Sequence, residues 1–281
     1  RKPCGILSDM YYHFLFDGAL MFFLWRHCTW GLDRPMTVML PLDAPFASHF
    51  AALFGDVEVQ MQKPEEMPRG DGGKSCQTGK GGRSGQSGKG RKGPPLILPV
   101  LPQGVAEVYF SKVGWPFPTH FMDAARAFRS HVLAQVAPSD LASSPTLTGV
   151  FRKKWGPAGE AGNRRTIAND QEVRAMLTDA AVELSLDYEE PTLETLDIWA
   201  QVKLFFRSQI VVAQHGSALA NILWMQPGSH VVELGLPLPM TSYKALCDAC
   251  GVNWVHSSSP GPMEGVLVVA TTELQTALAT C

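Results

Sequence analysis

One run of the chain constrains its fold more than any other: QIVVAQHGSALANILWMQPGSHVVELG, residues 209–235. Its β-branched segment IVVA predicts a buried strand, and the small residues that follow His215 and Gly216 predict a helix. A second apolar strand, HVVELG, comes after the Pro227–Gly228 turn. A strand, a helix and a strand in such close succession predict two neighbouring parallel strands, which is the repeating unit of an α/β fold.

The same alternation extends along both halves of the chain, and it predicts two α/β domains. Residues 1–145 form the first and residues 146–281 the second, each with a Rossmann-like parallel sheet, and the two face each other across a crevice. A Ser/Pro-rich connector at 138–145 separates them. Strands are predicted at 37–42, 56–61, 147–153, 252–256 and 266–270, and helices at 9–26, 120–136, 169–184, 193–209, 242–251 and 271–279.

A Gly/Lys/Ser tract at 63–95 interrupts the first half, and its composition predicts a disordered insertion. Residues 69–93 hold seven of the 24 lysines and arginines and ten of the 26 glycines. The rest of the chain keeps 17 basic against 25 acidic residues. An acidic fold body argues against nucleic-acid binding, which calls for a basic face.

The cysteines and the apolar runs exclude two other classes of protein. Six cysteines in 281 residues are too few for a disulfide scaffold, and Cys247 and Cys250 lie in a helix-like run, where packing on a helix face is the expected role. No run reaches the ~18–20 apolar residues of a membrane span. The chain shows no signal peptide, so either the protein is cytosolic or a targeting segment lies upstream.

The His-Gly-Ser turn is the first candidate site. In an open parallel sheet, ligands bind outside the carboxyl ends of the strands. Gly216 allows a sharp turn, Ser217 can cap the helix, Ala218 leaves room, and the first helical amides suit a phosphate. His215 could donate a hydrogen bond to that phosphate. An ordinary tight turn with a surface histidine explains the same residues equally well.

Four stretches resemble glycosyltransferase family 61. The first runs from 194 to 235 and includes the apolar strand, His-Gly, the small-residue helix, Pro-Gly and Val-Glu-Leu. The others are FRKKWGPAGEAGNRRTIANDQEV (151–173), YYHFLFDGALMFF (11–23) and SYKALCDACGVNWVHSS (242–258). The resemblance implies the two-domain fold called GT-B, UDP-sugar donors such as UDP-GlcNAc or UDP-xylose, and work in the lumen of the Golgi or endoplasmic reticulum. Any link to a membrane would be an anchor upstream of this chain.

An inverting transfer of this kind requires a base for the acceptor hydroxyl. Asp17 is the first choice, because it is an isolated acid on an apolar helix, and His13 lies four residues earlier on the same face. A solvent-facing aspartate and a buried structural histidine are the alternatives.

The leaving diphosphate requires positive potential. Arg152 and Arg165 supply it in this interpretation, and Glu233, at the end of its strand, would accept the ribose hydroxyls. A helix-capping or salt-bridged acid is the alternative for Glu233. The chain shows no Asp-x-Asp pair or clustered ligands for a metal, so no metal or other cofactor is expected.

The leading function is therefore an inverting transfer of GlcNAc or xylose from a UDP-sugar to a glycoprotein or polysaccharide acceptor. A non-catalytic relative that binds glycans or nucleotides is the alternative. A protein that binds polyanions through residues 69–93 is a third hypothesis, and apart from it no nucleic-acid partner is expected.

Overall fold

The computed structural model describes the chain in several stretches. They are residues 15, 19, 20, 22, 23, 26, 37–41, 46–62, 119–151, 167–235, 241–257 and 267–281. The chain divides into two compact units, Arg1–Ser111 and Lys112–Cys281. The predicted insertion at 63–95 lies entirely outside the described residues, which stop at Gln62 just before it.

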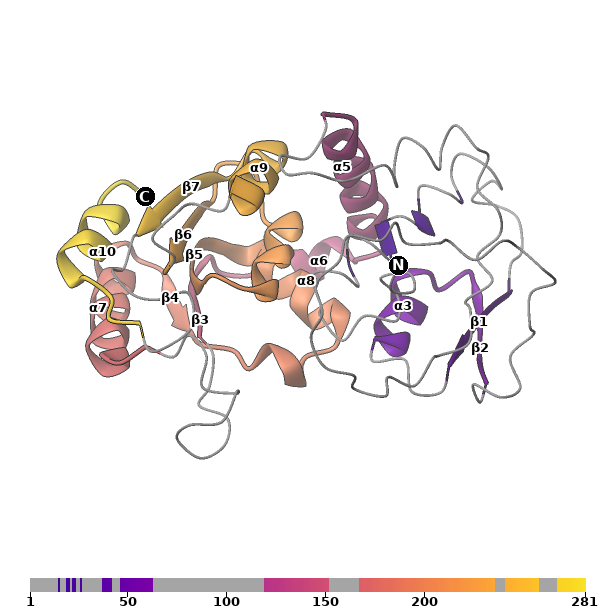
Figure 1. The fold of residues 1–281 in the computed structure, drawn as a ribbon, viewed down its shortest axis with the longest axis horizontal. Helices are drawn as coiled ribbons and strands as arrows, with labels where there is room; N and C mark the ends of the chain where they lie inside the picture. Colours follow the sequence, from indigo (N-terminus) through magenta and orange to yellow (C-terminus); the bar gives the residue numbers. More distant parts are fainter. Residues whose placement is uncertain are drawn as a thin grey trace, which may run out of the picture. The chain divides into compact units, whose positions relative to one another are not determined.

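The second unit contains a five-stranded parallel sheet (Figure 1). Its strands follow the order β4-β3-β5-β6-β7, and every neighbouring pair is parallel. The bounds are β3 Thr146–Val150, β4 Asp187–Glu189, β5 Ser208–Gln214, β6 His230–Leu234 and β7 Asn253–Ser257. The sheet confirms the predicted α/β class for this half of the chain.

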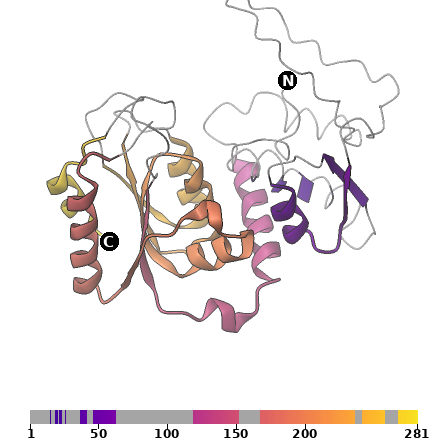
Figure 2. The same cartoon turned by 90° about the horizontal axis from the view of Figure 1, so that it is seen from below.

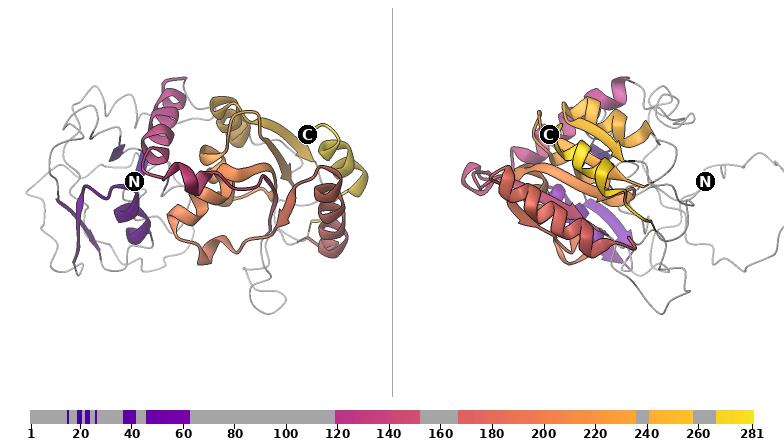
Figure 3. Two further views of the ribbon diagram at one scale, coloured as in Figure 1. Left: turned by 180° about the vertical axis from the view of Figure 1, so that it is seen from behind. Right: turned by 90° about the vertical axis from the view of Figure 1, so that its left-hand side faces the viewer.

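Helices cover both faces of the sheet (Figure 2). On one face lie α7 (Asp170–Glu183) and α10 (Thr271–Leu278), which pack against each other, as Figure 3 also shows. On the other lie α8 (Ile198–Arg207), the 3-10 helix η7 (Ser217–Trp224) and α9 (Thr241–Cys250). Short helices, α6 (Pro138–Leu141) and η6 (Leu193–Thr195), complete the connections.

Side chains alternate between the two layers along each strand. Ile210 and Val212 of β5 and Val232 of β6 join the core under α7 and α10, together with Leu177 and Leu274 of those helices. The intervening residues of the strands face the other layer. Burial on both faces is what a parallel sheet with helices on each side requires.

The boundary between the units lies earlier than the sequence predicts. The units separate between 111 and 112, whereas 145/146 was the expected division. The reason is α5 (Thr119–Leu133), which packs on η7 and α9 of the second unit. Its Arg126 and Arg129 donate to the carbonyl oxygens of Ala249 and Met225 at 3.0 and 2.8 Å.

The first unit is described in part. Its strands β1 (Thr37–Pro41) and β2 (Glu58–Gln62) form a parallel pair, and α3 (Ala47–Leu53) connects them. Phe22 contacts Phe50 and Phe54 edge-on, with ring centroids 4.9 Å apart in each pair. Both strands match the prediction, but a two-stranded pair does not make a second Rossmann-like domain, which stays a prediction.

Two further expectations concern helices. Cys247 and Cys250 are buried, unbridged thiols on α9, as expected of small residues packed on a helix face. Burial raises the pKa of the Cys250 thiol to about 11, and that of Cys247 further. Across the described stretches, no helix has both the length and the apolar character needed to cross a membrane.

Candidate functional site

The topology of the sheet points to one place for a ligand. Strand β4 lies on one side of β3, whereas β5 lies on the other side. The connections therefore diverge between β3 and β5, and ligands of open α/β sheets bind outside the carboxyl ends of the strands at such a point. The His215–Gly216 turn follows the carboxyl end of β5 directly.

The turn differs in detail from its prediction. Gly216 has φ 171° and ψ 177°, which is extended backbone that any residue can adopt, so its conformation does not require glycine. Ser217 does not cap the helix, because Gly216 occupies the cap position and Ser217 is the first helical residue. Ser217 and Ala218 are half-buried between neighbours that are fully buried. The small side chains thus form the accessible part of the turn.

His215 is held by a carboxylate on the neighbouring strand. Its Nδ1 contacts Oε1 of Glu233, and the indole of Trp254 donates to Oε2 of Glu233 at 2.9 Å. The histidine is 8% exposed and the glutamate 2% exposed. A carboxylate at one ring nitrogen fixes the orientation of the imidazole and the nitrogen that carries the proton.

The position of Glu233 corrects the role predicted for it. Both of its oxygens have internal partners, and the side chain is buried within the sheet, paired in register with Ala213 and His256. A buried, doubly engaged carboxylate is not available to two ribose hydroxyls. Glu233 instead positions His215, and this contact corresponds to the salt-bridged acid given as the alternative.

Helix α9 holds the turn from the other side. The Tyr243 hydroxyl donates to the Gly216 carbonyl at 2.7 Å, and the Tyr243 ring meets the His215 ring edge-on at 5.3 Å. The backbone N–H of His215 donates to the Leu234 carbonyl at 2.9 Å. Side chains from α9, β6 and β7 therefore fix the His-Gly pair.

A buried chain of amides supports η7 from below, and sequence reasoning missed it. Asn221 donates to Oε1 of Gln201 at 3.1 Å and accepts from the Trp224 indole at 3.0 Å. Gln201 in turn donates to the carbonyls of Leu193 and Leu196, both at 3.2 Å. Uncharged amides within apolar runs were the available signal, because such groups are buried only with partners.

The remaining predicted site residues lie outside the described residues. They are His13, Asp17, Arg152 and Arg165. Strand β3 ends at Val150, and Arg152 follows it by two residues in the sequence. In the stretches that the structure does describe, no group of three or more His, Cys, Asp or Glu side chains could hold a metal ion.

Comparison with known proteins gives one match. The model of the family described as Glycosyltransferase 61 matches residues 11–232. No curated protein matches the chain. The family match covers well over half of the 281 residues and includes β3, β5 and the His215–Gly216 turn. The chain belongs to glycosyltransferase family 61.

Proposed function

We propose that this glycosyltransferase is an inverting enzyme that transfers GlcNAc or xylose from a UDP-sugar to a protein-linked or polysaccharide acceptor. The observation that carries the proposal is the His215–Gly216 turn, fixed by Glu233 and Tyr243 at the point where the sheet connections diverge. A family member needs a rigid place for the leaving diphosphate, and this turn has the position and the small side chains for one.

In this proposal, the diphosphate lies over residues 215–218. The half-buried Ser217 and Ala218 let it approach the backbone, and the Ser217 hydroxyl can donate to an oxygen of it. The His215 ring, which Glu233 orients, adds a second N–H donor when both of its nitrogens carry protons. Arg152 and Arg165 supply the positive charge, since a guanidinium binds a phosphate through two parallel hydrogen bonds.

The chemistry proceeds in one displacement. Asp17, with His13 as its partner or substitute, removes the proton from the acceptor hydroxyl, and the oxygen forms a bond to the anomeric carbon of the sugar. The bond from that carbon to the diphosphate breaks, and UDP leaves with the electron pair. Preorganised donors at the turn and the arginines stabilise the charge that develops on UDP, so no metal is required in this scheme.

The same proposal places the enzyme in the lumen of the endoplasmic reticulum or Golgi, where UDP-sugars and glycoprotein acceptors meet. Sugar release from UDP-GlcNAc and UDP-xylose, measured with and without acceptor, tests the activity. We expect turnover with one of the two donors and an at least tenfold loss of UDP affinity in His215→Ala, the size of one charge-assisted hydrogen bond. UDP binding without any turnover would favour the non-catalytic relative.

A further inference from the structure

The Tyr243 hydroxyl bonds to the backbone of the His215–Gly216 turn. Tyr243 lies in the first turn of α9, is 6% exposed, and donates to the Gly216 carbonyl at 2.7 Å. The N–H of Leu219 donates to the same oxygen at 3.0 Å. This carbonyl is therefore held by two donors, one from η7 itself and one from the neighbouring helix α9.

The same hydrogen bond sets the direction of an N–H group. A peptide unit is planar and trans, so its C=O and its N–H point in opposite directions. Because the Gly216 carbonyl is directed toward Tyr243, the N–H of Ser217, which belongs to the same unit, is directed away from that hydroxyl. The N–H groups of Ser217 and Ala218 donate to no group in the described part of the chain. They are therefore available to a ligand of the turn.

The orientation of this peptide unit depends on hydrogen bonds because it follows a glycine. Gly216 has no side chain, so steric hindrance restricts its φ and ψ less than those of other residues. The bond from Leu219 joins residues three apart, and bonds of this 3-10 type have poorer geometry than those of an α-helix. The shorter bond from Tyr243 is thus the firmer constraint on the unit.

We infer that Tyr243 is a positioning residue for the leaving diphosphate: its hydroxyl turns the 216–217 peptide unit so that the Ser217 N–H meets a phosphate oxygen. Hydrogen bonds from backbone N–H groups to anionic oxygens are short and strong, and they weaken when the N–H points away from the acceptor. The inference rests on the proposed UDP-sugar donor and adds to it a residue that acts through the backbone. A hydroxyl that only packs α9 against η7 is the alternative.

Tyr243→Phe tests this role, because it removes the hydroxyl and keeps the ring that meets His215 edge-on. Calorimetric titration should show UDP binding weakened about fivefold to tenfold, which is most of the value of one hydrogen bond to a charged group. Uridine has no diphosphate, so its affinity should match that of the wild type. The melting temperature should fall only slightly, since Leu219 still donates to the Gly216 carbonyl.

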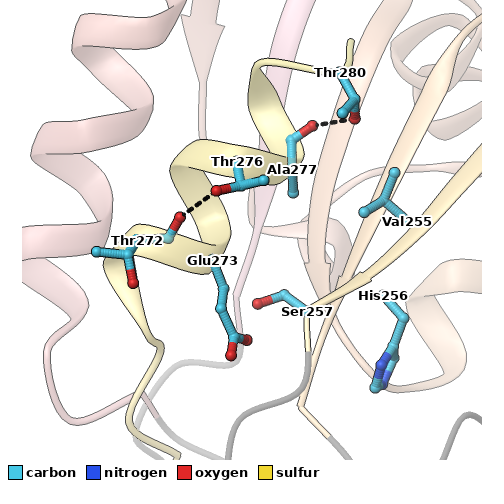
Figure 4. A pocket seen from close by; sticks show the side chains of 8 residues that line it. All are labelled: Val255, His256, Ser257, Thr272, Glu273, Thr276, Ala277 and Thr280. Atoms are coloured by element: carbon cyan, nitrogen blue, oxygen red, sulfur yellow. Dashed lines mark hydrogen bonds between the residues drawn. The ribbon is translucent and has the colours of Figure 1, made fainter.

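Two control substitutions lie on the other face of the sheet. Tyr188 of β4 packs against the core under α7 and α10, and its hydroxyl donates to Glu190 at 3.4 Å. Thr276 lies on the α10 wall of a pocket between α10 and β7, where its hydroxyl donates to the Thr272 carbonyl at 2.8 Å (Figure 4). Tyr188→Phe and Thr276→Val each remove one hydroxyl donor, and both should leave the affinities for UDP and uridine unchanged.

Ser217→Pro removes the N–H itself. Proline is favoured at the first position of a helix, which Ser217 occupies, and the extended Gly216 suits a residue that precedes proline. Compared with Ser217→Ala, which removes the hydroxyl alone, Ser217→Pro should weaken UDP about tenfold. In the Ser217→Pro background, Tyr243→Phe should weaken UDP no further, because two changes that act through one contact are not additive.

The inference would be overturned by equal losses of UDP and uridine in Tyr243→Phe, or by full additivity of Tyr243→Phe with Ser217→Pro. Unchanged UDP affinity in Tyr243→Phe would also overturn it, and a lower melting temperature in the same variant would then assign the hydroxyl to packing alone. Failure of the wild type to bind UDP at all would instead refute the donor proposal, and this role of Tyr243 with it.

Discussion

Replacement of Glu233 by glutamine tests the central feature of the site. The carboxylate contacts Nδ1 of the buried His215 and accepts from Nε1 of the half-buried Trp254. Glutamine keeps one carbonyl oxygen and presents an amide in place of the second oxygen, so one of the two donors loses its acceptor. A buried donor left unsatisfied costs about 1–3 kcal/mol. We expect the free energy of unfolding to fall by that amount, which lowers the melting temperature by several degrees.

The effect on ligands separates two roles for Glu233. If it positions His215 against the diphosphate, then Glu233→Gln should weaken UDP about tenfold and leave uridine unchanged, because uridine has no diphosphate. If it bound ribose, both ligands would weaken equally. Calorimetric titration of the two ligands measures this. Trp254→Phe is the matched control, since it removes the other donor to the same carboxylate and leaves the contact with His215 in place.

A double-mutant cycle then connects the effect to the histidine. In a His215→Ala background, Glu233→Gln should not change UDP affinity further, because residues that act through one contact are not additive. Full additivity of the two substitutions would refute the positioning role, and so would equal losses of UDP and uridine in Glu233→Gln alone.

Two further predictions concern other parts of the chain. Asp17→Asn should abolish sugar transfer and leave UDP affinity within about twofold, because it removes the proposed base and no donor to the diphosphate. A turnover assay and a calorimetric titration measure the two effects, and retained turnover would eliminate Asp17 as the base. Cys247 and Cys250 should resist iodoacetamide at pH 8 in the native protein, because burial holds both pKa values above that pH and the thiolate is the reactive form. Peptide mass spectrometry detects the labelling. Rapid modification of either thiol before unfolding would contradict their burial.

Periodicity predicted most of the sheet because each strand carries its own pattern. The runs at 147–153, 210–213, 230–235 and 252–256 correspond to β3, β5, β6 and β7. It missed β4, whose sequence Asp-Tyr-Glu is short and polar. An edge strand beside β3 needs few apolar residues, so local sequence does not reveal it.

The prediction of a strand at 266–270 was wrong for the residues that the structure describes. The cause is a side chain about a hundred residues earlier in the sequence. Among the described residues 267–270, only Leu267 forms a β-bridge, to Ile167, and the backbone of Val269 bonds to a side chain instead of a strand. The Asn169 amide donates to the Val269 carbonyl at 2.9 Å and its oxygen accepts from the Val269 N–H at 3.0 Å. The side chain of Asn169 thus takes the place of a strand partner, which no local pattern can indicate.

The end of β5 was predictable from the sequence, whereas the partners of the turn that follows it were not. The end of β5 could be located because the change from β-branched to small residues marks it. The helix that follows is of the 3-10 type over eight residues, and such helices have weaker hydrogen bonds of their own than α-helices. Its rigidity must therefore come from tertiary contacts: Tyr243 on the turn, Glu233 on the histidine, and Gln201 through Asn221 beneath it.

Those supporting residues come from α8, β6 and α9, so the turn is fixed only once the sheet and its helices have assembled. That dependence explains why Glu233 was assigned to a ligand from sequence alone. A carboxylate near the end of a buried strand needs a partner. From the sequence alone, a ligand and a histidine eighteen residues earlier meet that need equally well. The structure supplies the histidine.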